Sequence, residues 1–122
     1  MVADYRDLIV FHKAHLMSKV TQKAARGIRS ADYRYLKTQM MRSAPSVPAN
    51  IVEESGQETS KEFIRFLRYS RNSANETEYH CFTAHDYGLM HEATHRGIAA
   101  LIKEIRKMLE GLIDYLKKKP AD

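Results

Sequence analysis

The sequence predicts an all-α protein, an antiparallel up-and-down four-helix bundle, from three observations. Apolar residues recur at helical spacing through four long segments, residues 7–26, 32–55, 59–87 and 94–118. Glycine and proline are scarce, with five and three among 122 residues, which is few for a β-protein with many turns. The intervening loops are short, which favours antiparallel neighbours. We therefore expect one bundle domain over residues 1–122.

The first helix is expected to run from Asp7 to Arg26, because Gly27 stands where a glycine often ends a helix. Its apolar residues recur at the spacing of one helical face. The residues of this expected apolar face are Ile9, Leu16, Val20 and Ala24, with Met17 and Phe11 beside it.

The second helix is unusual because Pro45 and Pro48 stand inside an otherwise helical pattern. An interior proline costs about 3 kcal/mol, so two separate helices are the ordinary expectation. The apolar stripe nevertheless continues through both prolines: Leu36, Met40, Ala44, Val47 and Ile51. We therefore favour a single helix that is kinked at the prolines. Asp32 is its expected N-cap.

The third helix begins with a capping box, in which Thr59 and Glu62 satisfy each other's backbone donors. It is expected to run to Tyr87, where Gly88 and Leu89 match a glycine C-cap. Its inner face starts bulky and then becomes small, which lets a partner helix approach closely. The residues of that face are Phe63, Phe66, Leu67, Ser70, Ser73, Ala74, Thr77, Cys81 and Ala84.

The fourth helix, from Thr94 to Lys118, has an apolar stripe wider than one antiparallel bundle needs. The excess lies on the side of Leu101, Met108 and Tyr115, which is a candidate surface for self-association. A deeply buried helix explains the same pattern equally well.

Composition restricts the functional classes. The net charge is +5 and the isoelectric point about 9.4, which permits binding to nucleic acid or another polyanion without requiring it. A single cysteine, Cys81, fits a reducing compartment. No apolar stretch approaches the roughly 20 residues of a membrane span. We expect a cytoplasmic protein that does not contact a membrane.

Three segments carry a resemblance to a known family: residues 7–14 (DLIVFHKA), 46–53 (SVPANIVE) and 61–67 (KEFIRFL). They resemble the bacterial four-helix-bundle proteins encoded in intervening sequences of 23S rRNA genes, also called S23 ribosomal protein. The resemblance implies a bundle that typically assembles as a homopentamer and has no established enzymatic activity. We expect no cofactor. A related accessory protein of diversity-generating retroelements binds nucleic acid and a reverse transcriptase.

A basic ridge on the third helix is the candidate nucleic-acid site. Its cations recur at steps of four, three and three, and one aromatic residue lies next to them: Lys61, Arg65, Arg68, Arg71 and Tyr69. Such a ridge neutralises phosphates and stacks a base. A solvated helix face is the plainer interpretation. A second, weaker cluster surrounds the first loop: Arg26, Arg29, Arg34 and Lys37.

A second candidate is polar and lies between helices two and three. Its members are Arg42, Asn50, Glu53, Asn72 and Glu76, with Arg65 at the same interface. They either line a ligand pocket or hold the register of the two helices through paired hydrogen bonds, and pairing is the plainer interpretation.

His91-Glu92-Ala93-Thr94-His95 matches the zinc-hydrolase pattern H-E-x-x-H. That chemistry needs both histidines on one helical face and a third ligand, for which His85 or Glu110 are the candidates. The motif lies at a loop-to-helix junction, so a metal-dependent hydrolase is the least favoured hypothesis. Metal binding without function, by Cys81 and the nearby histidines, is a plainer interpretation.

The sequence therefore supports three functional hypotheses. The first is a non-enzymatic oligomeric bundle that serves as a nucleic-acid-associated scaffold. The second is a protein-interaction module that partners a polymerase or reverse transcriptase. The third is the metal-dependent hydrolase that uses His91 and His95.

Overall fold

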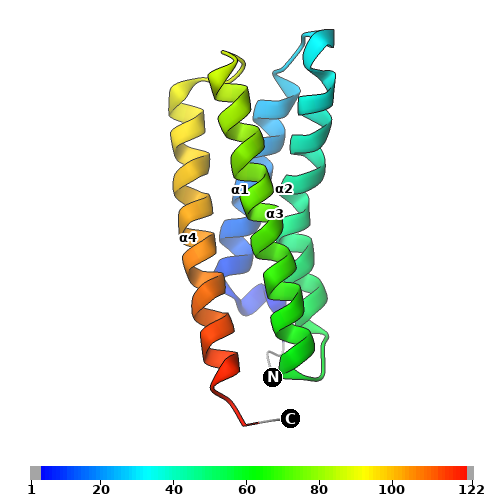
Figure 1. Ribbon diagram of the computed structural model, residues 1–122, viewed down its shortest axis with the longest axis vertical. Coiled ribbons are helices and arrows are strands. Elements are labelled where there is room, and N and C mark those ends of the chain that lie inside the picture. Colours follow the sequence, from blue (N-terminus) through cyan, green and yellow to red (C-terminus); the bar gives the residue numbers. More distant parts are fainter. Residues whose placement is uncertain (1–3, 121–122) are drawn as a thin grey trace.

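Four antiparallel helices lie side by side and form a single bundle (Figure 1). The computed structural model describes residues 4–120, apart from the side chain of Glu54. The helices are α1 (Ile9–Arg26), α2 (Arg34–Ser55), α3 (Ser60–Asp86) and α4 (Glu92–Lys117). Short 3-10 turns precede α1 and α2, at Tyr5–Asp7 and Ala31–Tyr33. Residues 4–120 contain no strand, and the predicted all-α bundle is confirmed.

The helix that contains two prolines is continuous. α2 runs from Arg34 to Ser55 with Pro45 and Pro48 inside it. Its predicted apolar face is confirmed, because every member is at most 1% exposed: Leu36, Met40, Ala44, Val47 and Ile51. Burial of this whole face offsets the cost of the two interior prolines. The kink expected at the prolines stays a prediction.

The apolar face predicted for α1 enters the core only in part, since Val20 and Ala24 are partly buried against it. Ile9 is 67% and Leu16 is 48% exposed. The helix instead turns mostly small or polar residues to the core: Val10, Ala14, Met17, Ser18, Thr21 and Ala25. Small residues let α1 approach its neighbours closely. The free energy gained by this close packing exceeds what burial of Ile9 and Leu16 would contribute. The result is an apolar surface on the outside of α1.

The helix ends follow the predicted capping with two differences. Thr59 Oγ1 accepts from the Glu62 backbone N–H at 3.2 Å, as expected. Gly88 has the left-handed φ of 75° that favours glycine, and the Leu89 N–H bonds to the Ala84 carbonyl at 2.8 Å.

The two differences concern α1 and α2. Gly27 ends α1 with a right-handed φ of −75°, so its conformational freedom is not used. The expected cap at Asp32 is wrong, because the Ser30 hydroxyl accepts from the Asp32 N–H at 3.3 Å. That bond caps the 3-10 turn Ala31–Tyr33, which leads directly into α2.

Candidate nucleic-acid interface

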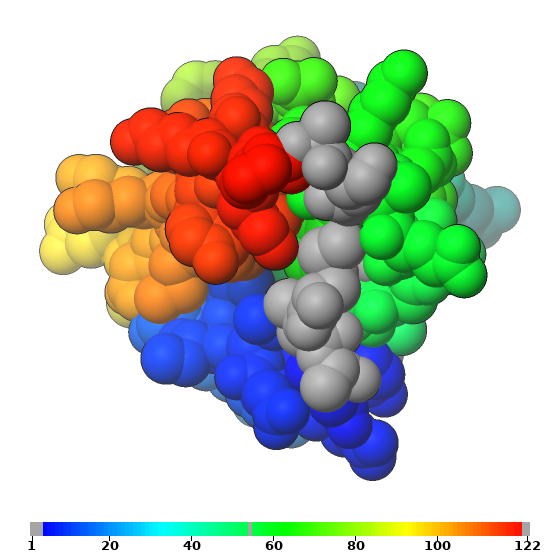
Figure 2. Space-filling view, turned by 90° about the horizontal axis from the view of Figure 1, so that it is seen from below, coloured from blue at the N-terminus to red at the C-terminus, as the bar shows by residue number. Residues whose placement is uncertain are grey.

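The five residues of the predicted basic ridge gather around one open hollow of about 360 Å³ on α3. Lys61, Arg65, Arg68, Tyr69 and Arg71 line it together with Glu62 and Asn72, and we call it the α3 hollow. It lies on the first turns of α3. In the end-on view of Figure 2 those turns (green) form one edge of the molecule, beside the end of α4 (red).

Acidic neighbours neutralise two of the four cations. Arg71 pairs with Glu110 of α4 at 2.7 Å, and Arg65 pairs with Glu62 at 3.1 Å. Lys61 and Arg68 are exposed and have no acidic partner within 4.0 Å among the described residues. Lys61 and Arg68 are therefore the two cations of the ridge that are available to bind an anion.

An aromatic ring lies beside these two cations. Tyr69 is 45% exposed, and its ring meets Phe66 edge-on at 5.6 Å between centroids. The Arg65 guanidinium carbon lies 5.8 Å from the centre of the Tyr69 ring, within the range of a cation–π contact. Phe66 and Arg65 fix the position of Tyr69, whose exposed part is available for stacking.

The polar residues predicted between α2 and α3 do not form one pocket. Arg42 and Glu76 pair across the two helices at 2.7 Å. Asn50 instead bonds within its own helix, donating to the Ser46 carbonyl at 2.8 Å. Glu53 is exposed, and Asn72 lines the α3 hollow. The structure therefore brings together two of the five predicted residues, as a register-holding pair rather than a binding site.

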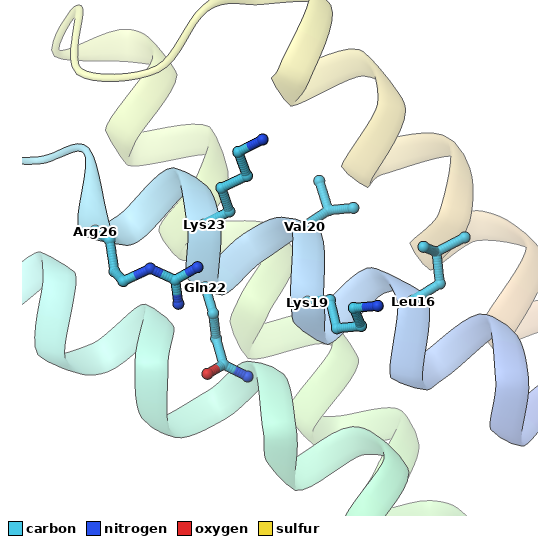
Figure 3. A pocket seen from close by; sticks show the side chains of 6 residues that line it. All are labelled: Leu16, Lys19, Val20, Gln22, Lys23 and Arg26. Atoms are coloured by element: carbon cyan, nitrogen blue, oxygen red, sulfur yellow. The ribbon is translucent and has the colours of Figure 1, made fainter.

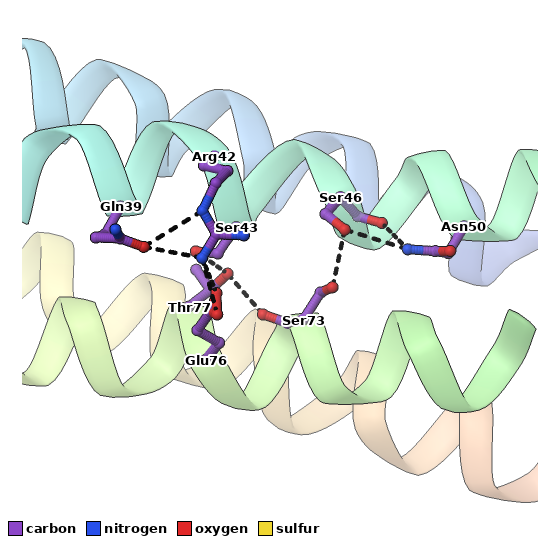
Figure 4. Close-up of polar contacts among 8 residues, drawn as sticks. All are labelled: Gln39, Arg42, Ser43, Ser46, Asn50, Ser73, Glu76 and Thr77. Carbon is purple, nitrogen blue, oxygen red and sulfur yellow. Dashed lines mark hydrogen bonds and ion pairs between the residues drawn. The ribbon is translucent and has the colours of Figure 1, made fainter.

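Small hydroxyl side chains fill the contact between α2 and α3 (Figure 4). We call this set the hydroxyl seam: Ser43, Ser46, Ser70, Ser73 and Thr77. The hydroxyl groups of Ser46 and Ser73 lie 2.9 Å apart, as do those of Ser43 and Thr77. Ser70 donates to the Val47 carbonyl at 2.8 Å. Three of these residues were predicted only as a small helix face, because the sequence does not show which hydroxyl groups meet.

The H-E-x-x-H motif begins one residue before its helix. His91 is the residue before α4, with extended backbone, and Glu92 pairs with Arg96 at 3.1 Å. The His95 ring stacks on His85 with centroids 4.5 Å apart. Across residues 4–120, no three histidine, cysteine or acidic side chains gather closely enough to hold a metal ion.

Cys81 is unsuited to act as a ligand or nucleophile. It is 1% exposed, and burial raises the pKa of its thiol to about 12. The thiol therefore stays protonated at neutral pH, whereas metals and electrophiles require the thiolate.

An apolar strip covers the outer junction of α1 and α4. Lys13 of α1 pairs with Glu104 of α4 at 2.7 Å, which places Ile9 level with Met108 and Leu16 level with Leu101. Ile9, Leu16 and Tyr115 are 67%, 48% and 62% exposed, and Leu101 and Met108 are half-buried. Ile9 and Leu16 of α1 therefore lie beside the apolar side chains of Leu101 and Met108 on α4. We call these four residues and Tyr115 the apolar strip.

None of the helices described here is long and apolar enough to cross a lipid bilayer. The fold and the surface sites define an all-α bundle that carries the α3 hollow and the apolar strip on its surface. The family model of the 23S rRNA-intervening sequence protein matches residues 6–111. The chain belongs to that family.

One similar solved structure is the crystal structure of a protein of unknown function from the S23 ribosomal protein family of Bacteroides thetaiotaomicron VPI-5482. The two chains are 23% identical with a TM-score of 0.78, over 86% of this chain and 98% of that one. This similarity shows the shared fold. No curated protein matches the sequence. Neither the family description nor the neighbour's names an enzymatic activity.

Proposed function

We propose that this protein is a non-enzymatic, self-associating scaffold that binds nucleic acid through the α3 hollow. The observation that carries the proposal is the arrangement of Lys61, Arg68 and Tyr69 around one open surface. Two cations without acidic partners meet phosphates, and an exposed tyrosine beside them stacks on a base. Both interactions tolerate any sequence, so we expect binding to single-stranded RNA with little base preference.

Self-association is the second part of the proposal and uses the apolar strip. Ile9, Leu16 and Tyr115 together expose large side chains along two adjacent helices. Exposed apolar strips of this kind are typical of protein interfaces. A homo-oligomer, for which the family resemblance implies a pentamer, covers the strip and repeats the α3 hollow around the assembly. Repetition raises the effective concentration of weak sites along one strand.

The binding part is tested with a labelled single-stranded RNA of about 20 nucleotides, the length of a few contact sites. We expect Lys61→Glu/Arg68→Glu to weaken binding by about tenfold or more, and Tyr69→Ala by about fivefold. Lys103→Glu/Lys107→Glu on α4 is the matched control, since both lysines are exposed and the charge change is equal. If the wild-type protein does not bind at low salt, the proposal is abandoned.

The assembly part is tested by light scattering before and after nuclease treatment. A mass of several chains that persists after nuclease supports assembly through protein contacts. Ile9→Glu/Tyr115→Glu should lower that mass without changing the helical content, since both side chains are exposed and lie outside the hollow lined by Lys19 and Lys23. A monomer in all samples contradicts self-association and leaves the binding measurement unaffected.

A further inference from the structure

Positive charge is strongly concentrated in one half of this bundle. Residues 9–55, which span α1, the loop and α2, contain eight lysines and arginines and three acids, Asp32, Glu53 and Glu54. Their surplus of five charges equals that of the whole chain, so the remaining segments carry no net charge. α1, α2 and the loop that joins them carry the basic character of the molecule.

Most of these cations lack an acidic partner. Only Lys13 and Arg42 form ion pairs, with Glu104 and Glu76, within the described part of the chain. The other six have no acid within 4.0 Å there, and we call them the basic end: Lys19, Lys23, Arg26, Arg29, Arg34 and Lys37. The α3 hollow, by comparison, retains two such cations.

The six cations of the basic end line two hollows. Lys19, Lys23 and Arg26 line one of about 320 Å³ on the outer face of α1, together with Leu16, Val20 and Gln22. Figure 3 shows Lys23 and Arg26 directed to opposite edges of the helix, with Lys19 between them. The second, of about 300 Å³, is lined by Arg29, Arg34 and Lys37 where the loop enters α2. Two residues separate Arg26 from Arg29, so the cations continue from one hollow into the next.

This arrangement stabilises the fold only in part, because Lys23 and Arg26 lie in the last turn of α1 and complement its dipole, whereas the other four cations do not. Cations close to one another repel, and a cation near a helix N-terminus opposes the helix dipole. The first turn of α2 contains Arg34 and no acid. Unpaired charge that does not stabilise the fold indicates a surface for an external polyanion.

We propose that the basic end binds the sugar–phosphate backbone of a nucleic acid. The cations on α1 are spaced about 6 and 4.5 Å apart along the axis, at 1.5 Å per residue. That spacing suits a chain that carries a phosphate every few ångströms. Tyr35 is 57% exposed beside Arg34 and adds a stacking surface at the same end. The inference rests on the proposed function, since it names a second contact for the same ligand.

The two contact surfaces are far apart on the bundle. Contacts of Ser43 with Thr77 and of Ser46 with Ser73 place Arg34 nearly level with residue 85 of α3. Arg68 lies 17 residues lower, or about 25 Å along the axis. A substitution at one surface therefore leaves the other intact, and the effects on binding should be separable.

The experiment compares three variants of equal charge change with labelled RNA, single-stranded and duplex, of about 20 nucleotides. The basic-end variant is Lys23→Glu/Arg26→Glu/Arg29→Glu. The second variant is Lys61→Glu/Arg68→Glu/Lys103→Glu, which alters the α3 hollow. The control is Lys103→Glu/Lys107→Glu/Lys117→Glu, on exposed positions of α4. Circular dichroism confirms that each variant folds.

We expect the basic-end variant to bind both RNAs at least tenfold more weakly than the control. The slope of log affinity against log salt should fall by about two, because three phosphate contacts are lost. Polyglutamate and anionic lipid vesicles should compete poorly with RNA.

Other outcomes contradict the inference. If the basic-end variant matches the control while the α3 variant loses binding, the basic end is not a contact and the proposed function stands. If wild-type protein binds neither RNA, both fail. If polyglutamate or vesicles compete as well as RNA, the surface is not a nucleic-acid site.

Discussion

Two polar regions of this bundle differ in how their side chains are partnered. The hydroxyl seam between α2 and α3 is largely buried, and each of its members has a hydrogen-bond partner. The six cations of the basic end are mostly exposed, and within residues 4–120 none has an acidic partner. Buried polar groups must be paired, whereas exposed charges need no partner in the fold. The seam therefore holds the helices together, and the basic end is available to a ligand.

The first prediction concerns the seam and has the largest expected effect. Ser70 is fully buried where α2 and α3 meet. We expect Ser70→Leu to lower the free energy of unfolding by about 3 kcal/mol, because the larger side chain overpacks the contact and removes a hydrogen bond. Urea unfolding measures the change. Ser70→Ala is the control and should cost only about 1 kcal/mol. Equal effects of the two variants would mean that the close approach of the helices is not limiting.

The second prediction concerns the basic end and has the opposite sign. We expect Arg34→Glu to raise the free energy of unfolding by about 0.5 kcal/mol, since it relieves repulsion and complements the helix dipole. The same variant should bind RNA more weakly. Thermal unfolding at low salt measures the gain, and high salt should reduce it. A loss of stability would show that Arg34 supports the fold, and the contrast between the two regions would disappear.

The third prediction has the smallest expected effect and returns to the contact between α2 and α3. Partial burial lowers the pKa of His80 below its ordinary value of 6.5; Arg42 adds to the shift and Glu76 opposes it. The folded state thus binds this proton less readily than the unfolded chain does. Stability should therefore decrease as the pH falls through the region below 6.5.

Thermal unfolding of the wild type and of His80→Gln, from about pH 7 to about pH 5, measures this effect. The variant should lose less stability than the wild type over that range. Parallel curves would assign the acid sensitivity to other groups.

Much of the fold followed from local patterns. The apolar stripe of α2, from Leu36 to Ile51, specified a continuous helix through two prolines, because burying one whole face is worth more than the two lost backbone bonds. The capping residues Thr59 and Gly88 marked helix ends, since each acts on backbone groups within a few residues.

The sequence predicted which cations lie together on α3, but not which of them pair with an acid. The spacing of Lys61, Arg65 and Arg68 placed them on one face of α3. Glu110, 39 residues beyond Arg71, neutralises one cation of the ridge, and only the packing of α4 against α3 brings the two together. The cluster near the first loop, predicted as the weaker one, has no acidic partner among the described residues, which the sequence does not show.

The sequence by itself determined the four helices, the ends marked by Thr59 and Gly88 and the surplus of positive charge, because these depend on neighbouring residues and on composition. Only the tertiary structure decided which face of α1 enters the core, with Ala14 buried and Leu16 exposed. It also decided which charges are paired. Both depend on contacts between residues far apart in the chain, whose energies no local pattern contains.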